Sequence, residues 1–316
     1  RYLKLLPPLS FSFLFLVILY SSMEWFILAV LGVVFWGLSN VVDKYFLSTK
    51  KIDPYALAFV MGISSILIIV PILLFFEFSF EMPWMILGIL VSAPRLITLI
   101  YYSKSVNSGD VSRALPIMKT SPIFVAVLAA IFLAERLSLI NYAGIVLVVI
   151  GGLVMSIKNV RNFSWHAPVK YAILTAIVYS ITLLIRKFIL GNFDFISLFF
   201  WVSVGQFLFS FLLFSKKTTR TNTLKFFNLR KKYLLTYLVS QIIAKIGSLF
   251  NIMALSLGSA SLIATVGAIQ PLFVLLFATL ISIFAPHIIK EDLAKENFLL
   301  KLMGILLIIF GTLFII

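Results

Sequence analysis

The chain has no cysteine and only two histidines, and both shortages limit its chemistry. Without cysteine it can form neither disulfides nor thiolate or zinc-thiolate sites. His166 and His287 fall in predicted loops between apolar runs, so we expect no histidine metal centre and no bound cofactor. Metal and thiol catalysis are therefore set aside.

Charge is scarce as well. Only 12% of the residues are charged and 62% are hydrophobic, a balance that the surface of a water-soluble domain of 316 residues does not tolerate. The net charge of +15 comes from basic residues clustered in short segments between apolar runs. Lipid headgroups and membrane topology explain that clustering better than nucleic acid, which we do not expect as a partner.

Apolar runs of about 20 residues, the length that crosses the hydrocarbon core as a helix, recur along the chain. Ten spans are predicted after Met23, at 24–46, 55–76, 84–106, 112–133, 138–157, 168–190, 195–214, 232–257, 260–285 and 298–316. Only two linkers are longer than a few residues, the basic segment 216–232 and the mixed-charge segment 287–297. The sequence predicts an all-α polytopic membrane protein in the lipid bilayer, without a separate soluble domain.

The two halves of the chain repeat one another. Shifts of 143, 149 and 160 residues superpose equivalent positions, which include Pro122 on Pro271, Gly109 on Gly258, Gly144 on Gly304, Gly151 on Gly311 and Lys44 on Lys187. Each half holds five spans, and this odd number inverts the second half in the membrane. Transporters use such inverted repeats to alternate access around a central site; a duplication that merely built a larger helical bundle is the alternative.

Three stretches of the chain carry a resemblance to a known family. They are VLGVVFWGLSNVVDKYFLS (30–48), ALPIMKTSPIFVAVLAAIFLAERLSLINYAGIVLVVIGGLVMS (114–156) and ALSLGSASLIATVGAIQPLFVLLFATLI (254–281). The chain beyond residue 22 resembles the EamA-type permeases of the drug/metabolite transporter superfamily. The resemblance implies a secondary transporter built from two five-helix EamA-like repeats, 23–157 and 168–316.

In that family a mid-span proline, a following glutamate and paired glycines recur. Here they correspond to Pro122, Glu135, Gly144 and Gly151. The second half departs from the pattern, because APHIIKEDLAKEN (285–297) replaces the expected glycine-glutamate corner. No family role therefore passes to a glutamate in that segment.

The glycines and prolines also have a physical interpretation. Small residues let helix backbones approach closely, so the two glycine pairs predict tight packing of the fifth span against the tenth. Pro122 and Pro271 each remove a helix hydrogen bond and favour a kink. A kink beside Ser121 or Gln270 is a candidate cavity lining, and simple packing is the alternative.

Three basic residues, Arg95, Lys119 and Lys245, fall inside predicted spans, where no acidic residue lies at comparable depth. A charge at the bilayer centre costs at least about 2.5–3.5 kcal/mol, so these side chains should face the bundle interior or a water-filled cavity. Arg95 and Lys245 are near mid-span and almost equivalent in the repeat, which predicts that they face each other. Lys119 is shallower and is predicted to be accessory. The alternative is that a phenol or a freed carbonyl satisfies these cations structurally.

Polar side chains accompany the cations at helical spacing. The predicted substrate-binding residues are Arg95, Lys245, Lys119, Trp36, Asn40, Tyr102, Tyr179, Gln241 and Gln270. Lysine and arginine bind carboxylates and phosphates through charge-assisted hydrogen bonds. We therefore predict a small organic anion or zwitterion as substrate, such as an amino acid or a phosphorylated metabolite. The alternatives are a membrane-embedded lipid-handling protein, which should carry a catalytic or lipid-phosphate motif, and a non-transporting helical scaffold.

Basic residues also predict the orientation in the membrane. The end of the bundle that receives segments 50–51, 158–161, 216–232 and 290–295 is the basic one and is expected to face the cytoplasm of a cell whose plasma membrane holds the protein. Residues 24 and 316 then lie outside, the reverse of what the family resemblance implies. Residues 1–22 are an eleventh span, a non-native extension or a cleaved signal peptide, although no A-x-A-like site precedes Met23.

Overall fold

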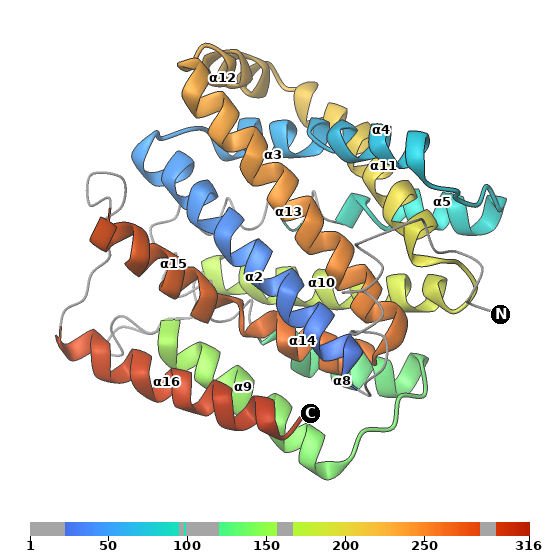
Figure 1. Ribbon diagram of the computed structural model, residues 1–316, viewed down its shortest axis with the longest axis vertical. Helices are drawn as coiled ribbons and strands as arrows, with labels where there is room; N and C mark the ends of the chain where they lie inside the picture. Colours follow the sequence, from blue (N-terminus) through green and yellow to red (C-terminus); the bar gives the residue numbers. More distant parts are fainter. Residues whose placement is uncertain (1–22, 95–97, 99–119, 157–166, 285–294) are drawn as a thin grey trace.

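The computed structural model describes residues 23–94, 98, 120–156, 167–284 and 295–316 (Figure 1). Every regular element in these ranges is a helix, and six helical stretches are long and apolar enough to cross a membrane. Three shorter apolar helices accompany them. The chain is therefore a helical membrane protein, as the composition predicted.

The predicted spans coincide with helices wherever the structure describes them. In chain order the helices are α2 (Glu24–Lys44), η1 (Tyr45–Thr49), α3 (Pro54–Ile63), α4 (Ile66–Phe75), α5 (Met82–Leu90), α8 (Ser121–Phe132), α9 (Leu139–Ser156), α10 (Ala167–Leu190), α11 (Phe195–Phe214), α12 (Lys217–Phe227), α13 (Lys231–Leu257), α14 (Ala260–Ala268), α15 (Gln270–Phe284) and α16 (Lys295–Leu313). The short π-helix η1 continues α2 directly.

Short polar side chains start several of these helices. The carboxylate of Asp53 accepts a hydrogen bond from the backbone N–H of Ala56 at 2.9 Å, and Asp194 accepts one from Ser197 at 2.8 Å. Ser259 caps α14 in the same way. Such caps satisfy backbone donors that the first turn leaves unpaired, which fixes where α3, α11 and α14 begin.

Two of the predicted spans are each divided into two helices. The span predicted at 55–76 is interrupted after Ile63, where the Ser64 hydroxyl donates to the carbonyl of Met61 at 2.8 Å. The span predicted at 260–285 is interrupted at Ile269. Pro271 is the second residue of α15, and Pro122 is the second residue of α8.

The kink predicted at Pro271 corresponds to the break between α14 and α15, and the kink predicted at Pro122 is untested because residues 112–119 of its span lie outside the described ones. Both prolines occupy the first turn of a helix, where a missing N–H leaves no hydrogen bond unmade and the fixed φ favours helix initiation. The linker predicted at 216–232 does connect two spans, and most of it folds as helix α12.

Glycine pairs bring two sets of helices into close contact. A methyl group added to Gly144 would lie 2.7 Å from the carbonyl oxygen of Gly311, and one added to Gly151 would lie 2.7 Å from that of Gly304. The predicted tight packing of these two spans, α9 and α16, is confirmed. Gly32 of α2 and Gly247 of α13 approach each other in the same way, which brings α2 against α13.

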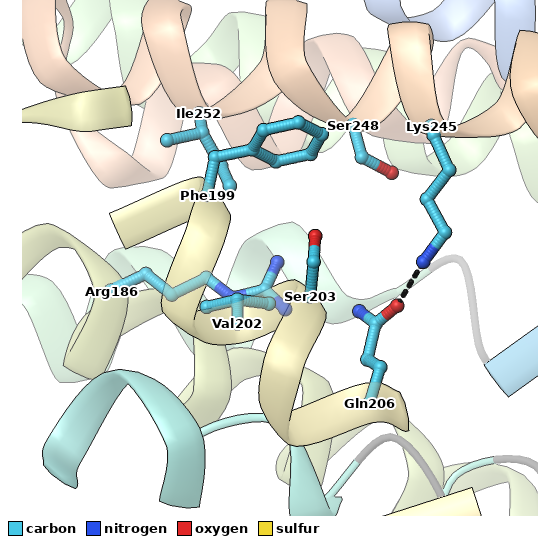
Figure 2. A pocket seen from close by; sticks show the side chains of 8 residues that line it. All are labelled: Arg186, Phe199, Val202, Ser203, Gln206, Lys245, Ser248 and Ile252. Carbon is cyan, nitrogen blue, oxygen red and sulfur yellow. Dashed lines mark hydrogen bonds between the residues drawn. The ribbon is translucent and has the colours of Figure 1, made fainter. Parts of the chain in front are cut away.

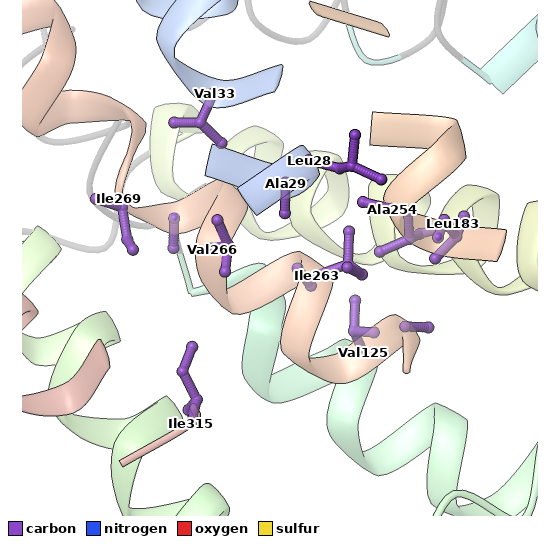
Figure 3. Close-up of a cluster of buried hydrophobic side chains, with 14 of the residues drawn as sticks. Leu28, Ala29, Val33, Val125, Leu183, Ala254, Ile263, Val266, Ile269 and Ile315 are labelled. Carbon is purple, nitrogen blue, oxygen red and sulfur yellow. The ribbon is translucent and has the colours of Figure 1, made fainter. Parts of the chain in front are cut away.

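The largest apolar core lies where helices of both halves of the chain meet (Figure 3). It joins Leu28 and Val33 of α2, Val125 of α8, Leu183 of α10 and Ile263 of α14, all nearly or fully buried. Helix α13 crosses the middle of the bundle beside α2 (Figure 1). This packing holds the polar face of α13 in the interior.

Candidate functional site

A small cavity lies between α10, α11 and α13 (Figure 2). Its volume is about 10 Å³, close to the space that one water molecule needs. The lining residues are Arg186, Phe199, Val202, Ser203, Gln206, Lys245, Ser248 and Ile252. Two of these eight are cations and none is a carboxylate, so the described lining is electropositive.

Lys245 is the most deeply placed charge in this lining. Its side chain is only 4% exposed, and it lies 14 residues after the first residue of α13, a distance of roughly 21 Å along the helix. Its ammonium donates to the hydroxyl of Ser65 at 2.6 Å and to the side-chain oxygen of Gln206 at 2.5 Å. The cation is thus held by neutral oxygen atoms from two other helical segments.

The break between α3 and α4 explains how Lys245 is tolerated. Ser65 lies in that break, two residues after the end of α3. Ser65 is also the N-cap of α4, so the opposite dipoles of the two helix ends meet here and the hydroxyl is the contact that favours the cation. The discontinuous helix therefore supplies an acceptor to the buried ammonium, and transporters use such breaks around bound ions and substrates.

Arg186 lines the same cavity from α10. It lies four residues before the end of that helix, nearer the membrane surface than Lys245, and its side chain is partly buried. Figure 2 shows its guanidinium approaching the cavity beside Val202. An arginine and a lysine on neighbouring helices can hold one oxyanion between them, since the guanidinium binds two oxygens and the ammonium a third.

Two predicted site residues lie near Lys245. The indole N–H of Trp36 donates to the hydroxyl of Ser248, which lines the cavity, and to the carbonyl of Ala244, both at 3.2 Å. Gln241 lies one turn from Lys245 and is 1% exposed. In the described part of the chain neither its amide oxygen nor its amide nitrogen has a hydrogen-bond partner. A buried amide of this kind can bind a further polar group.

Three other predicted residues that the structure describes do not line the cavity. Asn40 is exposed on α2, Tyr179 packs near Gly267 of α14, and Gln270 begins α15. Arg95, Lys119 and Tyr102 lie outside the described residues. The predicted pairing of Arg95 with Lys245 is consequently untested.

Sequence reasoning missed several lining residues. Arg186 belongs to a polar stripe of the sixth span that predicts an interior position, but it was not among the predicted substrate-binding residues. Ser203 and Gln206 of the lining carried no signal as single polar residues in apolar runs, and neither did Ser65, which does not line the cavity but accepts from Lys245. Their common property is that each follows a helix face that meets α13, and this property depends on tertiary packing.

An aromatic cluster closes the interior toward the basic end of the bundle. Phe46, Phe226 and Tyr237 are each at most 1% exposed, and their ring centroids are 5.1–6.0 Å apart. Tyr237 lies one turn beyond Gln241 on α13. Along this helix the polar stripe from Ser248 through Lys245 and Gln241 therefore ends at a packed apolar layer.

Two charged side chains fix the junction between the end of α13 and the start of α14. The ammonium of Lys187 donates to the carbonyls of Leu255 and Gly258, each at 2.8 Å, which are acceptors at the helix C-terminus. Glu135 accepts from the backbone N–H of Ala260 at 2.6 Å and from the hydroxyl of Ser261 at 2.7 Å. A cation at one helix end and an anion at the next both oppose the exposed dipoles.

This contact gives Glu135 a physical role. It connects the segment after α8 to the first turn of α14, so it links the first half of the chain to the second.

Comparison with protein families matches this first half to a model described as the EamA-like transporter family. The match covers residues 23–157, less than half of the chain. The resemblance seen in the sequence is confirmed there, and the EamA-like character of residues 168–316 stays a prediction.

An "Uncharacterized transporter" of Archaeoglobus fulgidus is 31% identical over 162 residues, which are 50% of this chain and 56% of that protein. The chain thus matches little more than half the length of this relative.

A solved crystal structure of another protein shares the overall fold. It superposes with a TM-score of 0.67 at 13% sequence identity and covers 93% of this chain and 96% of its own. At this identity the similarity extends to the fold alone.

Proposed function

We propose that this EamA-like protein is a secondary transporter that moves a small organic anion or zwitterion by alternating access. The observation that carries the proposal is the cavity shared by Arg186 and Lys245, whose described lining has two cations and no carboxylate. Carboxylate- and phosphate-bearing metabolites match this lining through charge-assisted hydrogen bonds. A cationic substrate would meet repulsion from both side chains.

The contacts of α9 with α16 support a ten-helix inverted repeat. A shift of 160 residues relates Gly144 to Gly304 and Gly151 to Gly311. Across the helix pair, Gly144 approaches Gly311 and Gly151 approaches Gly304. Such reciprocal contacts arise when two equivalent elements pack about a two-fold axis. Two inverted halves can exchange outward-open and inward-open shapes around a central site.

The family match of residues 23–157 and the name of the Archaeoglobus relative favour a transporter over an enzyme.

The aromatic cluster of Phe46, Phe226 and Tyr237 suits a state closed toward the basic end. With the basic end in the cytoplasm of a plasma membrane, as the charge distribution predicts, this would be an inward-closed state.

A ligand screen by thermal stability tests the proposed substrate class. Purified protein in a neutral detergent is heated with amino acids, sugar phosphates, nucleotides or cationic dyes. A ligand that binds only the folded state raises the melting temperature, so at least one anion or zwitterion should do so. The same screen on Arg186→Gln should lose this shift. Stabilisation by cationic dyes, with no anion or zwitterion active, would overturn the proposed substrate class.

A further inference from the structure

Helix α12 contributes no residue to the described cavity lining, and the proposed transport does not require it. It is 11 residues long and polar, too short to cross a bilayer, and it connects the ends of α11 and α13 at the basic end of the bundle (Figure 1). One face docks on the protein, because Thr219, Thr223 and Phe226 are all at most 2% exposed. Phe226 belongs to the aromatic cluster that also contains Phe46 and Tyr237. The helix is therefore fixed in position by its own packing.

The opposite face of α12 mixes cations with large apolar side chains. Lys217, Arg220, Leu224 and Phe227 follow the spacing of one helix face and are all exposed. Leu224 is 62% and Phe227 44% exposed. A face with this composition suits the boundary between headgroups and acyl chains, where apolar side chains enter the lipid and cations stay at phosphate level.

The segment around α12 is strongly and uniformly positive. Seven basic residues and no acidic residue lie between positions 216 and 232. All seven are exposed. Arg220 is held beside the end of α11 by a 2.8 Å hydrogen bond from its Nε to the carbonyl of Phe214. Its charge is thus placed at the surface without being neutralised.

Neighbouring side chains extend the positive surface. The ammonium of Lys50 lies 4.0 Å from the ring centroid of Tyr233, and that of Lys216 lies 5.4 Å from the ring of Tyr55. Hydrogen bonding to Tyr233 raises the pKa of Lys50 above its ordinary value, because the bond favours the charged form. Tyrosines interleaved with lysines are typical of the headgroup layer.

We propose that α12 is an interfacial helix whose Lys217, Arg220 and Lys225 surface binds the headgroups of anionic phospholipids. Two residues separate α11 from α12 and three separate α12 from α13, so the helix stays close to the membrane surface. Phosphate-bearing lipids are the anions present at that surface. An acidic soluble partner would have no use for Leu224 and Phe227, whereas acyl chains would cover both.

The lipid site is separate from the substrate cavity, and lipid binding there does not depend on transport. Each cation near an anionic surface strengthens binding by about fivefold, so three together change lipid preference by up to about 100-fold. The attraction is long-ranged at low salt and is screened as the Debye length falls from about 10 Å at 0.1 M to about 3 Å at 1 M.

The absence of cysteine makes the test direct. Thr221, exposed on α12, is changed to cysteine (Thr221→Cys) and labelled with a fluorophore, and the protein is placed in nanodiscs of phosphatidylcholine mixed with phosphatidylglycerol. Bromine, a quencher, is carried either by the phosphatidylglycerol or by the phosphatidylcholine. The ratio of the two quenching efficiencies reports the local enrichment of the anionic lipid around α12.

We expect phosphatidylglycerol to be enriched several-fold over its bulk fraction, and the triple variant K217Q/R220Q/K225Q to reduce the ratio to the bulk value. Arg136→Gln, which removes an exposed cation beyond α8, serves as the matched control and should leave the ratio unchanged. High salt should abolish the enrichment without any substitution at these positions. A ratio equal to the bulk composition at low salt, or one insensitive to both the triple variant and salt, would refute the lipid site. Neither result bears on the substrate cavity.

Discussion

Replacing Lys245 by methionine should weaken substrate binding while leaving the protein folded. The ammonium is 4% exposed and lines the cavity that Arg186 also lines. A hydrogen bond to a charged group contributes about 1.5–3 kcal/mol, which corresponds to roughly 10- to 100-fold in affinity at about 1.4 kcal/mol per tenfold. We therefore expect the KM for the transported anion to rise by this factor.

Stability should respond differently from transport. The methionine would leave the oxygens of Ser65 and Gln206 without the Lys245 donor, at a cost of about 1–3 kcal/mol each. It would also remove a buried cation, whose desolvation costs several kcal/mol. The two effects oppose one another, so the expected change in melting temperature is small. Methionine has nearly the length of lysine and fills the same space.

The assay is concentration-dependent uptake of the labelled anion into proteoliposomes. Lys232→Met makes the same substitution at an exposed position near the start of α13 and should leave KM unchanged. Lys245→Arg keeps the charge and should retain most of the affinity if charge is what matters. An unchanged KM in Lys245→Met would refute the assignment. A large fall in melting temperature for both Lys245 variants would instead assign Lys245 a structural role.

Three further predictions concern the scaffold, and each is measured by thermal unfolding in detergent. Gly151→Ala should destabilise the protein by about 1–3 kcal/mol because its methyl group would meet the α16 backbone, whereas Gly152→Ala, whose methyl group would lie 3.8 Å from the carbonyl oxygen of Ala268, should be tolerated. Equal effects would contradict the packing. Glu135→Ala should cost about 1.5–3 kcal/mol by removing the acceptor at the start of α14, and a neutral result would exclude that role. Phe226→Ala should cost about 3–5 kcal/mol, and Phe227→Ala far less because that ring is 44% exposed; the reverse order would place the wrong face of α12 against the protein.

The membrane class and the helix positions were predictable because bilayer thickness dictates the length of an apolar run. The glycine pairs of α9 and α16 were predictable for a similar reason, since Gly144 and Gly151 recur as Gly304 and Gly311 at a constant shift. The breaks within the spans predicted at 55–76 and 260–285 could not be predicted from the sequence. Ser64 and Ser65 lie inside a continuous apolar run, and only packing against α13 selects a break there over an uninterrupted helix.

The candidate site was predicted in part. Lys245 was identifiable because a charge at mid-span is costly and therefore demands a partner or a cavity. Arg186 lies in a polar stripe of the sixth span, but it is four residues from the helix end and it was not predicted to bind substrate. Gln206 is one of several polar residues along α11, and the sequence alone does not show which of them faces Lys245.

The amphipathic character of α12 was hidden by its composition. Between residues 216 and 232 the basic side chains dominate, and they predict an exposed linker. The buried face consists of two threonines and Phe226, which is too little apolar surface to stand out as a helix signal. Its tertiary partner, the aromatic cluster with Phe46 and Tyr237, is contributed by distant parts of the chain.

Substrate exchange in proteoliposomes tests whether the protein transports an organic anion or zwitterion. Vesicles are loaded with an unlabelled candidate that stabilised the protein, and entry of the same compound in labelled form is followed with a cationic dye as comparison. We expect exchange of the anion or zwitterion above that of protein-free vesicles and no exchange of the dye. Exchange of the dye alone, or of neither compound, would contradict it.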